Sequence, residues 1–313
     1  MNPTFFGKAG KSKVQIVEYV NKKGEHFQFS VKRDDLIHPL VSGNKWRKLK
    51  FNVQYAVDEG YTGIASFGGA FSNHIAALAA AGRAVAMPTL GLIRSHEIDE
   101  QNPTLRRARG MGMRLINLSR DDYRRRHDTE FLAQLQQQFS DYFFVPEGGS
   151  NHLAEPGLAE LAEEIREAGN FDVIACAIGS GGTISGLMNA MPRQRFIGVA
   201  AVNDAQLLTQ LESQAHGRLQ VHLASLFGGY GRLTPELETF CLDFFAQTQI
   251  PIEPVYTGKL FYALCHHRAE LGISNNTRVL ALHTGGLQGL HGLIYRRQID
   301  PERWQPIIAT LPV

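Results

Sequence analysis

The stretch Ile178-Gly179-Ser180-Gly181-Gly182-Thr183-Ile184-Ser185-Gly186 places a glycine-rich turn between the apolar run 173–178 and a predicted helix. Glycines let the backbone turn tightly and direct successive N–H groups towards one point, and the helix N-terminus adds the positive end of its dipole. The stretch lacks the Gly-Lys-Ser/Thr ending of a Walker loop, and Ile184 stands where a dinucleotide fingerprint requires glycine. We therefore predict a phosphate-binding turn; a plain strand-to-helix turn is the alternative.

Short apolar runs alternate with helical segments along the chain, which is typical of an α/β fold. Other glycine-rich turns follow apolar runs at Gly68-Gly69 and Gly285-Gly286, and ligands bind outside the carboxyl ends of strands in open α/β sheets. No Pro/Ser-rich linker is present, so two domains would interleave. The predicted strands are residues 63–67, 84–90, 113–118, 143–146, 173–178, 196–202 and 278–282, and the predicted helices include residues 72–82, 102–110 and 155–168.

Composition is that of an ordinary globular protein with a large core and two domains. The chain has 313 residues, of which 43% are hydrophobic and 20% charged, and 32 basic residues against 30 acidic ones give a net charge of +2. This balance argues against nucleic acid or a membrane as the main partner. Asp121 and Asp122 interrupt the basic cluster 120–127, which we predict to be a solvated helix face.

The three cysteines, Cys176, Cys241 and Cys265, are far apart and form no Cys-x-x-Cys pair. This spacing argues against a disulfide framework or a structural zinc site, and we predict no metal site. Cys176 lies in an apolar run and is predicted to be a buried packing residue. The polar residues 1–13 show no secretory signal, and no run approaches eighteen apolar residues, so a cytoplasmic location is expected.

Lys45 is the first candidate for chemistry. It lies in Ser42-Gly43-Asn44-Lys45-Trp46-Arg47-Lys48-Leu49, where it opens a predicted helix just after Gly-Asn. A lysine that is held rigidly and partly desolvated has a lowered pKa and can attack a carbonyl carbon, as is needed to hold an aldehyde cofactor as a Schiff base. Lysines near helix starts are common, so this segment alone leaves a solvated surface lysine as the alternative.

A second glycine turn, Ser66-Phe67-Gly68-Gly69-Ala70-Phe71-Ser72-Asn73-His74, also opens a helix. Ser72 and Asn73 would lie at the helix cap, where side-chain and backbone donors meet. Such a cap could hold a substrate carboxylate or a cofactor phenolate. Plain N-capping remains the alternative, because Ser and Asn are preferred there in any helix.

Together these motifs resemble pyridoxal-phosphate enzymes of the tryptophan-synthase β type (fold type II), and most closely the group of D-cysteine desulfhydrases and 1-aminocyclopropane-1-carboxylate (ACC) deaminases. The resemblance spans most of the chain in the expected order. It rests on Lys32-Arg33-Asp34-Asp35-Leu36, Gly43 to Leu49, Ser72-Asn73-His74, Gly148-Gly149-Ser150-Asn151, Gly179 to Thr183, Pro254-Val255-Tyr256-Thr257-Gly258-Lys259 and His283-Thr284-Gly285-Gly286.

The resemblance implies two interleaved three-layer α/β/α domains with mainly parallel sheets. Residues 1–48 and 156–313 would form the larger domain, which anchors the cofactor, and residues 49–155 the smaller one on the substrate side. The group commonly forms homodimers, so a homodimer is expected on the same ground.

The resemblance also implies how pyridoxal 5'-phosphate would be held. Lys45 would carry it, Asn73 would hydrogen-bond its phenolic oxygen, and Thr284 would lie near its pyridine nitrogen. The residues that would cradle its phosphate are Gly179, Ser180, Gly181, Gly182 and Thr183.

The substrate, a small amino acid, would meet Ser72, Asn73 and His74, with Ser72 as a polar catalytic partner. Tyr230 and Tyr256 resemble the two active-site tyrosines of the group; judged without it, either could be an ordinary core or surface aromatic. Lys45, once displaced by the substrate, would remove the α proton. Loss of a leaving group from the β carbon and hydrolysis would then give a keto acid and ammonia.

The group's ACC deaminases typically have Glu at the position of Thr257. Thr257 and Thr284 are neutral, which resembles the desulfhydrase pattern and favours D-cysteine as substrate. ACC deamination is the alternative, and a non-catalytic protein that binds pyridoxal phosphate or a metabolite is the alternative from another class. Phe71 and the run Ile75-Ala76-Ala77-Leu78 depart from the group's usual residues and would make the pocket more apolar, which leaves other amino acids open as substrates.

Overall fold

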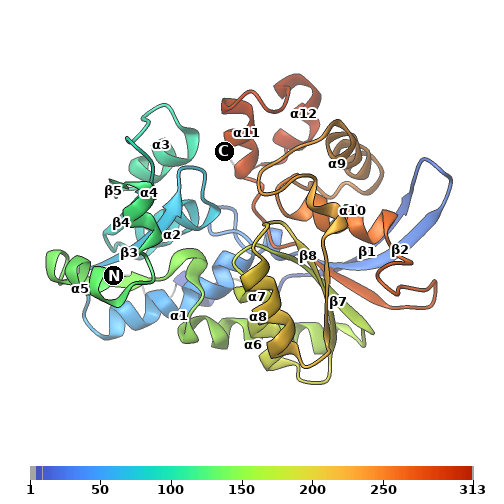
Figure 1. Cartoon of the computed structure of the whole chain (residues 1–313), viewed down its shortest axis with the longest axis horizontal. Coiled ribbons are helices and arrows are strands. Elements are labelled where there is room, and N and C mark those ends of the chain that lie inside the picture. The colour runs from blue at the N-terminus through green and yellow to red at the C-terminus, as the bar shows by residue number, and fades with distance from the viewer. Residues whose placement is uncertain (1–4, 9, 312–313) are drawn as a thin grey trace.

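The computed structural model describes residues 5–8 and 10–311, which form two β-sheets flanked by helices (Figure 1). The strands are β1 (Val14–Val20), β2 (His26–Lys32), β3 (Gly63–Gly69), β4 (Thr89–Arg94), β5 (Met113–Leu118), β6 (Tyr142–Val145), β7 (Val173–Ile178), β8 (Arg195–Ala200), β9 (Leu219–His222) and β10 (Val279–Leu282). The α-helices are α1 (Asn44–Asp58), α2 (Asn73–Val85), α3 (Pro103–Gly110), α4 (Arg120–Arg124), α5 (Thr129–Gln138), α6 (Glu155–Ala168), α7 (Gly182–Ala190), α8 (Ala205–Ala215), α9 (Pro235–Thr248), α10 (Thr257–His266), α11 (Gly289–Tyr295) and α12 (Pro301–Ile308). Short 3-10 helices are η1 (Phe5–Lys8), η2 (Asp34–Leu36), η3 (Glu147–Gly149), η4 (His152–Ala154) and η5 (Ala224–Leu226).

The larger sheet is built from both ends of the chain. Its strand order is β1-β2-β10-β7-β8-β9, so the C-terminal strand β10 lies between β2 and β7. Only the β1–β2 pair of this sheet is antiparallel. The smaller sheet, β5-β4-β3-β6, is parallel throughout and comes from the middle of the chain. The predicted interleaved α/β fold with mainly parallel sheets is therefore confirmed.

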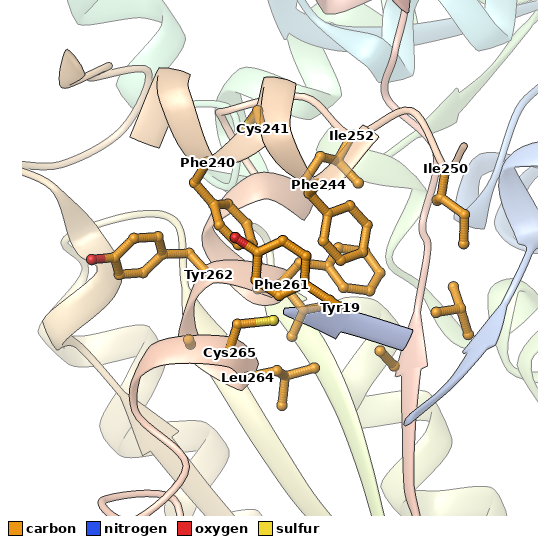
Figure 2. Packing of buried hydrophobic residues seen from close by; sticks show 14 of the residues in the cluster. Tyr19, Phe240, Cys241, Phe244, Ile250, Ile252, Phe261, Tyr262, Leu264 and Cys265 are labelled. Carbon is orange, nitrogen blue, oxygen red and sulfur yellow. The ribbon is translucent and has the colours of Figure 1, made fainter. Parts of the chain in front are cut away.

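Each face of the larger sheet packs against its own set of helices, because side chains alternate along a strand. Val173 and Ala175 of β7 pack in one core with residues of α9, α10 and α12, whereas Ile174 and Cys176 pack in another core with α6, α7 and α8. The first core is rich in aromatic rings (Figure 2). The ring centroids of Phe244 and Phe261 lie 4.9 Å apart. Cys176 is fully buried, as predicted.

The smaller sheet is likewise covered on both faces. Ile64 and Ile93 pack with α1, α2 and α3, while Ala65 and Phe67 pack with α4 and α5 on the other side. Both sheets are thus three-layer sandwiches, as the resemblance implied. The strands of the smaller sheet all fall within the predicted small domain, residues 49–155; the limits of that domain themselves stay a prediction.

The predictions for residues 113–118, 155–168 and 173–178 coincide with β5, α6 and β7. The predicted strand 84–90 is wrong, because α2 continues to Val85 and β4 begins only at Thr89. Ala86 ends the helix in a left-handed conformation with φ 55°, and the Met87 N–H bonds to Gly82 O at 2.8 Å. Alanine is a poor marker of such an end, since glycine or asparagine is the usual residue there.

A buried ionic network fixes α1 against the larger sheet. Lys32 Nζ lies 2.5 Å from Glu164 Oε2, and Arg47 pairs with Glu164 Oε1 at 2.6 Å and with Asp34 Oδ1 at 3.1 Å. All four side chains are almost wholly excluded from solvent. Removing one partner of such a buried set leaves an uncompensated charge, which is strongly destabilising, so the network holds the start of α1 in place.

Within residues 5–8 and 10–311, none of the helices combines the length and the apolar character that crossing a membrane requires.

Candidate active site

A cavity of about 1690 Å³ lies where the carboxyl ends of strands from both sheets face each other. The smaller sheet contributes the turn 69–74, and the larger sheet contributes the turns 179–183 and 284–286. Ligands bind at such strand ends in open α/β sheets. Every residue that the sequence assigned to cofactor or substrate lines this cavity, namely Lys45, Ser72, Asn73, His74, Gly179, Ser180, Gly181, Gly182, Thr183, Tyr230, Tyr256 and Thr284.

Lys45 is the second residue of α1 and is held by a close approach of two backbone segments. A Cβ atom on Gly43 would overlap Thr284 O, and Gly43 has φ +65°, so only glycine fits. The Asn44 N–H donates to Thr284 O at 3.2 Å, and Lys45 Nζ donates to Asn44 Oδ1 at 3.0 Å. Enclosure by the cavity walls lowers the pKa of Lys45 to about 8. The lowered pKa agrees with the expectation for Lys45, and its attachment to a cofactor stays a prediction.

The turn 179–183 forms a cradle at the N-terminus of α7. Gly181 precedes the helix with φ +76°, and Thr183 Oγ1 accepts a hydrogen bond from Asn44 Nδ2 at 2.9 Å. A Cβ atom on Gly182 would overlap the Ser150 side chain and lie 2.8 Å from Lys48 Nζ. The absence of a side chain at Gly182 therefore lets the Lys48 cation and the Ser150 hydroxyl lie beside the N-terminus of α7, a donor set that binds phosphate.

Lys48 was missed by the sequence analysis. It is 1% exposed, and its Nζ donates to Ser150 Oγ at 3.0 Å and points towards the carbonyl oxygen of Gly148. Burial, together with the charge of Lys45, lowers the pKa of Lys48 well below its usual value. The spacing of three residues from Lys45 on one helix was a usable signal, because residues i and i+3 share a face.

Ser72 is the N-cap of α2, as the plain N-capping alternative predicted. Its Oγ accepts from the N–H groups of His74 at 3.2 Å and Ile75 at 3.3 Å. Asn73 Oδ1 accepts a hydrogen bond from Gln288 Nε2. The Asn73 Nδ2 group faces the turn at Gly286, where a Cβ atom would lie only 2.9 Å from it. The amide donors of Asn73 thus face the cavity.

His74 is 2% exposed and bonded to the β3 strand. Its Nε2 lies 2.8 Å from Ser66 Oγ, and that hydroxyl donates to Val145 O at 2.7 Å. Ser66 therefore accepts from Nε2–H, which leaves Nδ1 as a lone pair that has no partner among the described residues. Burial and the nearby charges of Lys45 and Lys48 lower the pKa of His74 well below its usual value, so the ring is neutral.

The two tyrosines meet at the cavity. Tyr256 Oη lies 3.3 Å from Tyr230 Oη, and the rings are 5.9 Å apart in an edge-on arrangement. Gly179 makes room for Tyr256, because a Cβ atom there would lie 2.9 Å from the ring. Burial raises the pKa of Tyr256 well above its usual value, so its hydroxyl stays protonated. Tyr230 lies on a glycine-flanked loop and is 53% exposed.

Glu253 is a second residue that the sequence analysis missed. It is 1% exposed yet borders the cavity, and its carboxylate accepts from the N–H groups of Val255, Tyr256 and Thr257 at 2.8–2.9 Å. Burial raises the pKa of Glu253 to about 7, although these N–H groups oppose the rise. Thr257 is wholly buried, bonded to Glu253, and absent from the cavity lining, so its side chain does not face a ligand there.

The residues that depart from the group divide into two sets. Phe71, Ala76 and Ala77 line the cavity, whereas Ile75 and Leu78 are fully buried in the core between α2 and its neighbours. Phe71 packs against α11, with its ring under the Arg296 guanidinium at 4.5 Å. The expected increase in apolar character thus comes from Phe71, Ala76 and Ala77 alone.

The prediction that residues 120–127 form a solvated helix face needs correction. The helix α4 covers only Arg120–Arg124, and Arg126 beyond it pairs with Glu147 at 2.6 Å, is partly buried and lines the cavity. Tyr123 is also buried and bonded to Glu147. A charge pattern along the sequence does not reveal this, because Glu147 joins the cluster only through the tertiary fold.

Comparison with known proteins identifies the family. The sequence profile described as "Pyridoxal-phosphate dependent enzyme" matches residues 15–285. The chain belongs to this family. Pyridoxal phosphate is accordingly the cofactor of this pyridoxal-phosphate dependent enzyme, and the residues present fit it: the glycine cradle with Lys48 suits a phosphate, and Lys45 lies in the same cavity.

Similar proteins and structures include D-cysteine desulfhydrases and ACC deaminases. A bifunctional D-cysteine desulfhydrase/ACC deaminase of Arabidopsis thaliana is 30% identical over 295 residues, which cover 83% of this chain and 73% of the relative. A Pyrococcus furiosus protein with the provisional name ACC deaminase is 29% identical over 282 residues, covering 83% and 84%. The crystal structure of an ACC deaminase homologue matches with a TM-score of 0.75 at 23% identity and covers 92% of this chain and 93% of that one. These matches confirm a fold type II enzyme of the lyase and deaminase group.

Proposed function

We propose that this pyridoxal-phosphate dependent enzyme eliminates sulfide from D-cysteine, giving pyruvate, hydrogen sulfide and ammonia. The observation that carries the proposal is the convergence on one cavity of Lys45, the glycine cradle beside Lys48, and the Tyr230–Tyr256 pair. Bound pyridoxal phosphate supplies an electron sink for charge that develops at the substrate's α carbon. The protein must attach the cofactor, orient the substrate and transfer protons.

Lys45 and Lys48 would divide the work of holding the cofactor. Lys48 Nζ lies 2.8 Å from where a Cβ atom on Gly182 would be, so its charge would stabilise the phosphate. Lys45 would bind the cofactor covalently and, when released by the substrate, act as the base for the α proton. Its pKa of about 8 makes a neutral amine accessible near neutral pH, as a general base requires. Asn73 would donate to the phenolic oxygen, and Thr284 would face the ring nitrogen.

The tyrosines and Ser72 would serve the substrate. Tyr256 keeps its proton because burial raises its pKa, so its hydroxyl would donate a hydrogen bond to the departing sulfur. The Tyr230 hydroxyl lies 3.3 Å from that of Tyr256 and would link it to solvent, since about half of Tyr230 is exposed. Ser72 would orient the substrate through its hydroxyl. His74 would support Ser72 and Asn73 from its buried position. Its Nδ1 is the ring nitrogen that has no partner among the described residues.

ACC deamination is the second candidate, and the names of the relatives favour it as well. Opening a cyclopropane ring demands a deeper electron sink than expelling sulfide does. Glu253 lines the cavity, but its carboxylate is engaged by three backbone N–H groups and the Thr257 hydroxyl. Thr284 is neutral, so D-cysteine remains the first choice.

The test is keto acid release by the purified, cofactor-loaded enzyme with D-cysteine, L-cysteine and ACC in parallel. Keto acid from D-cysteine alone is expected. Keto acid from ACC alone would overturn the substrate assignment, and turnover of any amino acid would exclude the non-catalytic alternative. Lys45→Ala should abolish covalent attachment, measured by mass spectrometry after borohydride reduction. Lys50→Ala is the matched control, because Lys50 lies on the same helix but pairs with Glu160 outside the cavity.

A homodimer and a cytoplasmic location stay predictions. Sedimentation of the purified protein at a series of concentrations would test the first.

A further inference from the structure

Two histidines and a glutamate gather where β9 and α10 end, in the larger domain. They are His222, His267 and Glu270, and one ligating atom from each lies within 4.8 Å of the other two. The two imidazole rings are 4.8 Å apart at an angle of 51°, and His267 Nδ1 lies 2.8 Å from Glu270 Oε1. None of the three lines the active-site cavity.

His222 is the unusual member of this cluster. It is only 6% exposed, and its Nε2 atom has no hydrogen-bond partner within the described parts of the chain. A buried polar nitrogen without a partner costs free energy, and native proteins leave few such atoms unpaired. The ring packs directly against His267, so a group bound between the two histidines would supply the missing interaction.

We propose that His222, His267 and Glu270 bind one divalent transition-metal ion, zinc by preference. Two imidazoles and one carboxylate are a donor set that zinc accepts, and a water molecule would fill the fourth tetrahedral position. This site was not expected from the sequence, because the sequence analysis considered cysteine spacing alone, whereas these ligands come from segments 45 residues apart.

The geometry needs only a small contraction. Bond lengths of about 2.0–2.1 Å around a tetrahedral zinc place neighbouring ligand atoms about 3.3 Å apart. The three ligating atoms already lie within 4.8 Å. Glu270 is 61% exposed and His267 21% exposed, so both side chains can move without disturbing the core. Their exposed ion pair is worth little, and its loss would not oppose binding.

By coordinating residues from both, the ion would link two segments that lead to the active site. His222 ends β9, and the chain from there runs through the glycine-rich loop to Tyr230; His267 immediately follows α10, whose first residue is the neighbour of Tyr256. Lys259 of α10 already ties this loop by donating to Leu226 O at 2.8 Å and Gly229 O at 2.7 Å. The metal adds a second tie at the start of the loop. Its role is to stabilise, and the ion takes no part in the chemistry.

The experiment is a zinc titration of chelator-treated holoenzyme, followed by calorimetry and thermal unfolding. We expect one saturable zinc site per chain and a rise in Tm of about 3 °C at saturating zinc, because a ligand that binds only the folded state stabilises it. His267→Ala and Glu270→Gln should each weaken zinc binding at least about tenfold and abolish the Tm rise. Both side chains are accessible, so the variants should fold.

The matched control is His26→Ala, which removes an exposed histidine from β2 at no proposed site. It should bind zinc and gain Tm as the parent protein does. Zinc held by the cofactor or by the active-site cavity would instead survive His267→Ala and Glu270→Gln. Absence of saturable binding would overturn the proposal. So would binding that survives both His267→Ala and Glu270→Gln, or that His26→Ala also abolishes.

Discussion

The Thr257 hydroxyl lies 3.1 Å from Glu253 Oε1, and both side chains are buried. The same hydroxyl accepts the Glu253 N–H at 3.0 Å, so the two residues bond each other in both directions. Thr257 therefore supports the loop that carries Tyr256, and does not face the cavity. Any effect of Thr257 on the substrate would therefore pass through Glu253 and Tyr256.

Thr257→Glu should destabilise the protein and should not create ACC cleavage. The new carboxylate would be buried against Glu253, and an unpaired buried charge costs about 3–5 kcal/mol. Urea unfolding measures the loss. Thr257→Ser keeps the hydroxyl and should lose about 1 kcal/mol for one methyl group. A Thr257→Glu protein as stable as its parent would contradict the assigned packing.

Glu253 should make the protein less stable as the pH rises from about 4.5 to about 7. Burial raises its pKa in the folded state from 4.5 to about 7, so the folded state holds a proton that the unfolded state has lost in this range. The favourable contribution is complete below the lower value and is lost above the higher one. A shift of this size corresponds to about 3 kcal/mol at most.

Urea unfolding of the parent and of Glu253→Gln at pH 5 and pH 8 tests this sign. The amide cannot ionise, so Glu253→Gln should gain stability relative to the parent as the pH rises. A difference between the two proteins that does not change with pH would refute the raised pKa.

Ser72 should show separable effects on stability and on turnover. Its Oγ caps α2, so Ser72→Ala should cost about 1 kcal/mol, whereas Ser72→Gly should cost only a few tenths because glycine is tolerated at this position. Both variants lose the hydroxyl, and if Ser72 orients the substrate, both should lose kcat by about 10²-fold. Near-normal turnover by Ser72→Gly would reduce Ser72 to a helix cap.

Phe71 and Gly292 should be coupled across the cavity wall. A Cβ atom on Gly292 would lie 2.5 Å from the Phe71 ring, so Gly292→Ala should cost about 1–3 kcal/mol through overpacking. With Phe71→Ala present, the same change should be neutral or slightly stabilising, because alanine favours a helix over glycine. A double-mutant cycle in urea gives the coupling, and additive costs would contradict the contact.

The local patterns predicted much of the fold. The β5, α6 and β7 segments coincide with their predictions because periodicity, capping residues and flanking glycines all lie within a few residues of each element. The candidate cofactor and substrate residues came from motifs that resemble a family; all of them line one cavity, and their roles stay predictions. The end of α2 was missed because Ala86 adopts a left-handed conformation, which is not typical of alanine.

What the sequence by itself determined is therefore the α/β class, the glycine turn before α7 and the candidate lysine, each of which depends on neighbours along the chain. Only the tertiary structure decided that Lys48 lies beside the turn 179–183, that Arg126 pairs with Glu147, and that His222 packs against His267. These contacts join segments far apart in sequence, so they form only when the two sheets pack around the cavity and bury the side chains together.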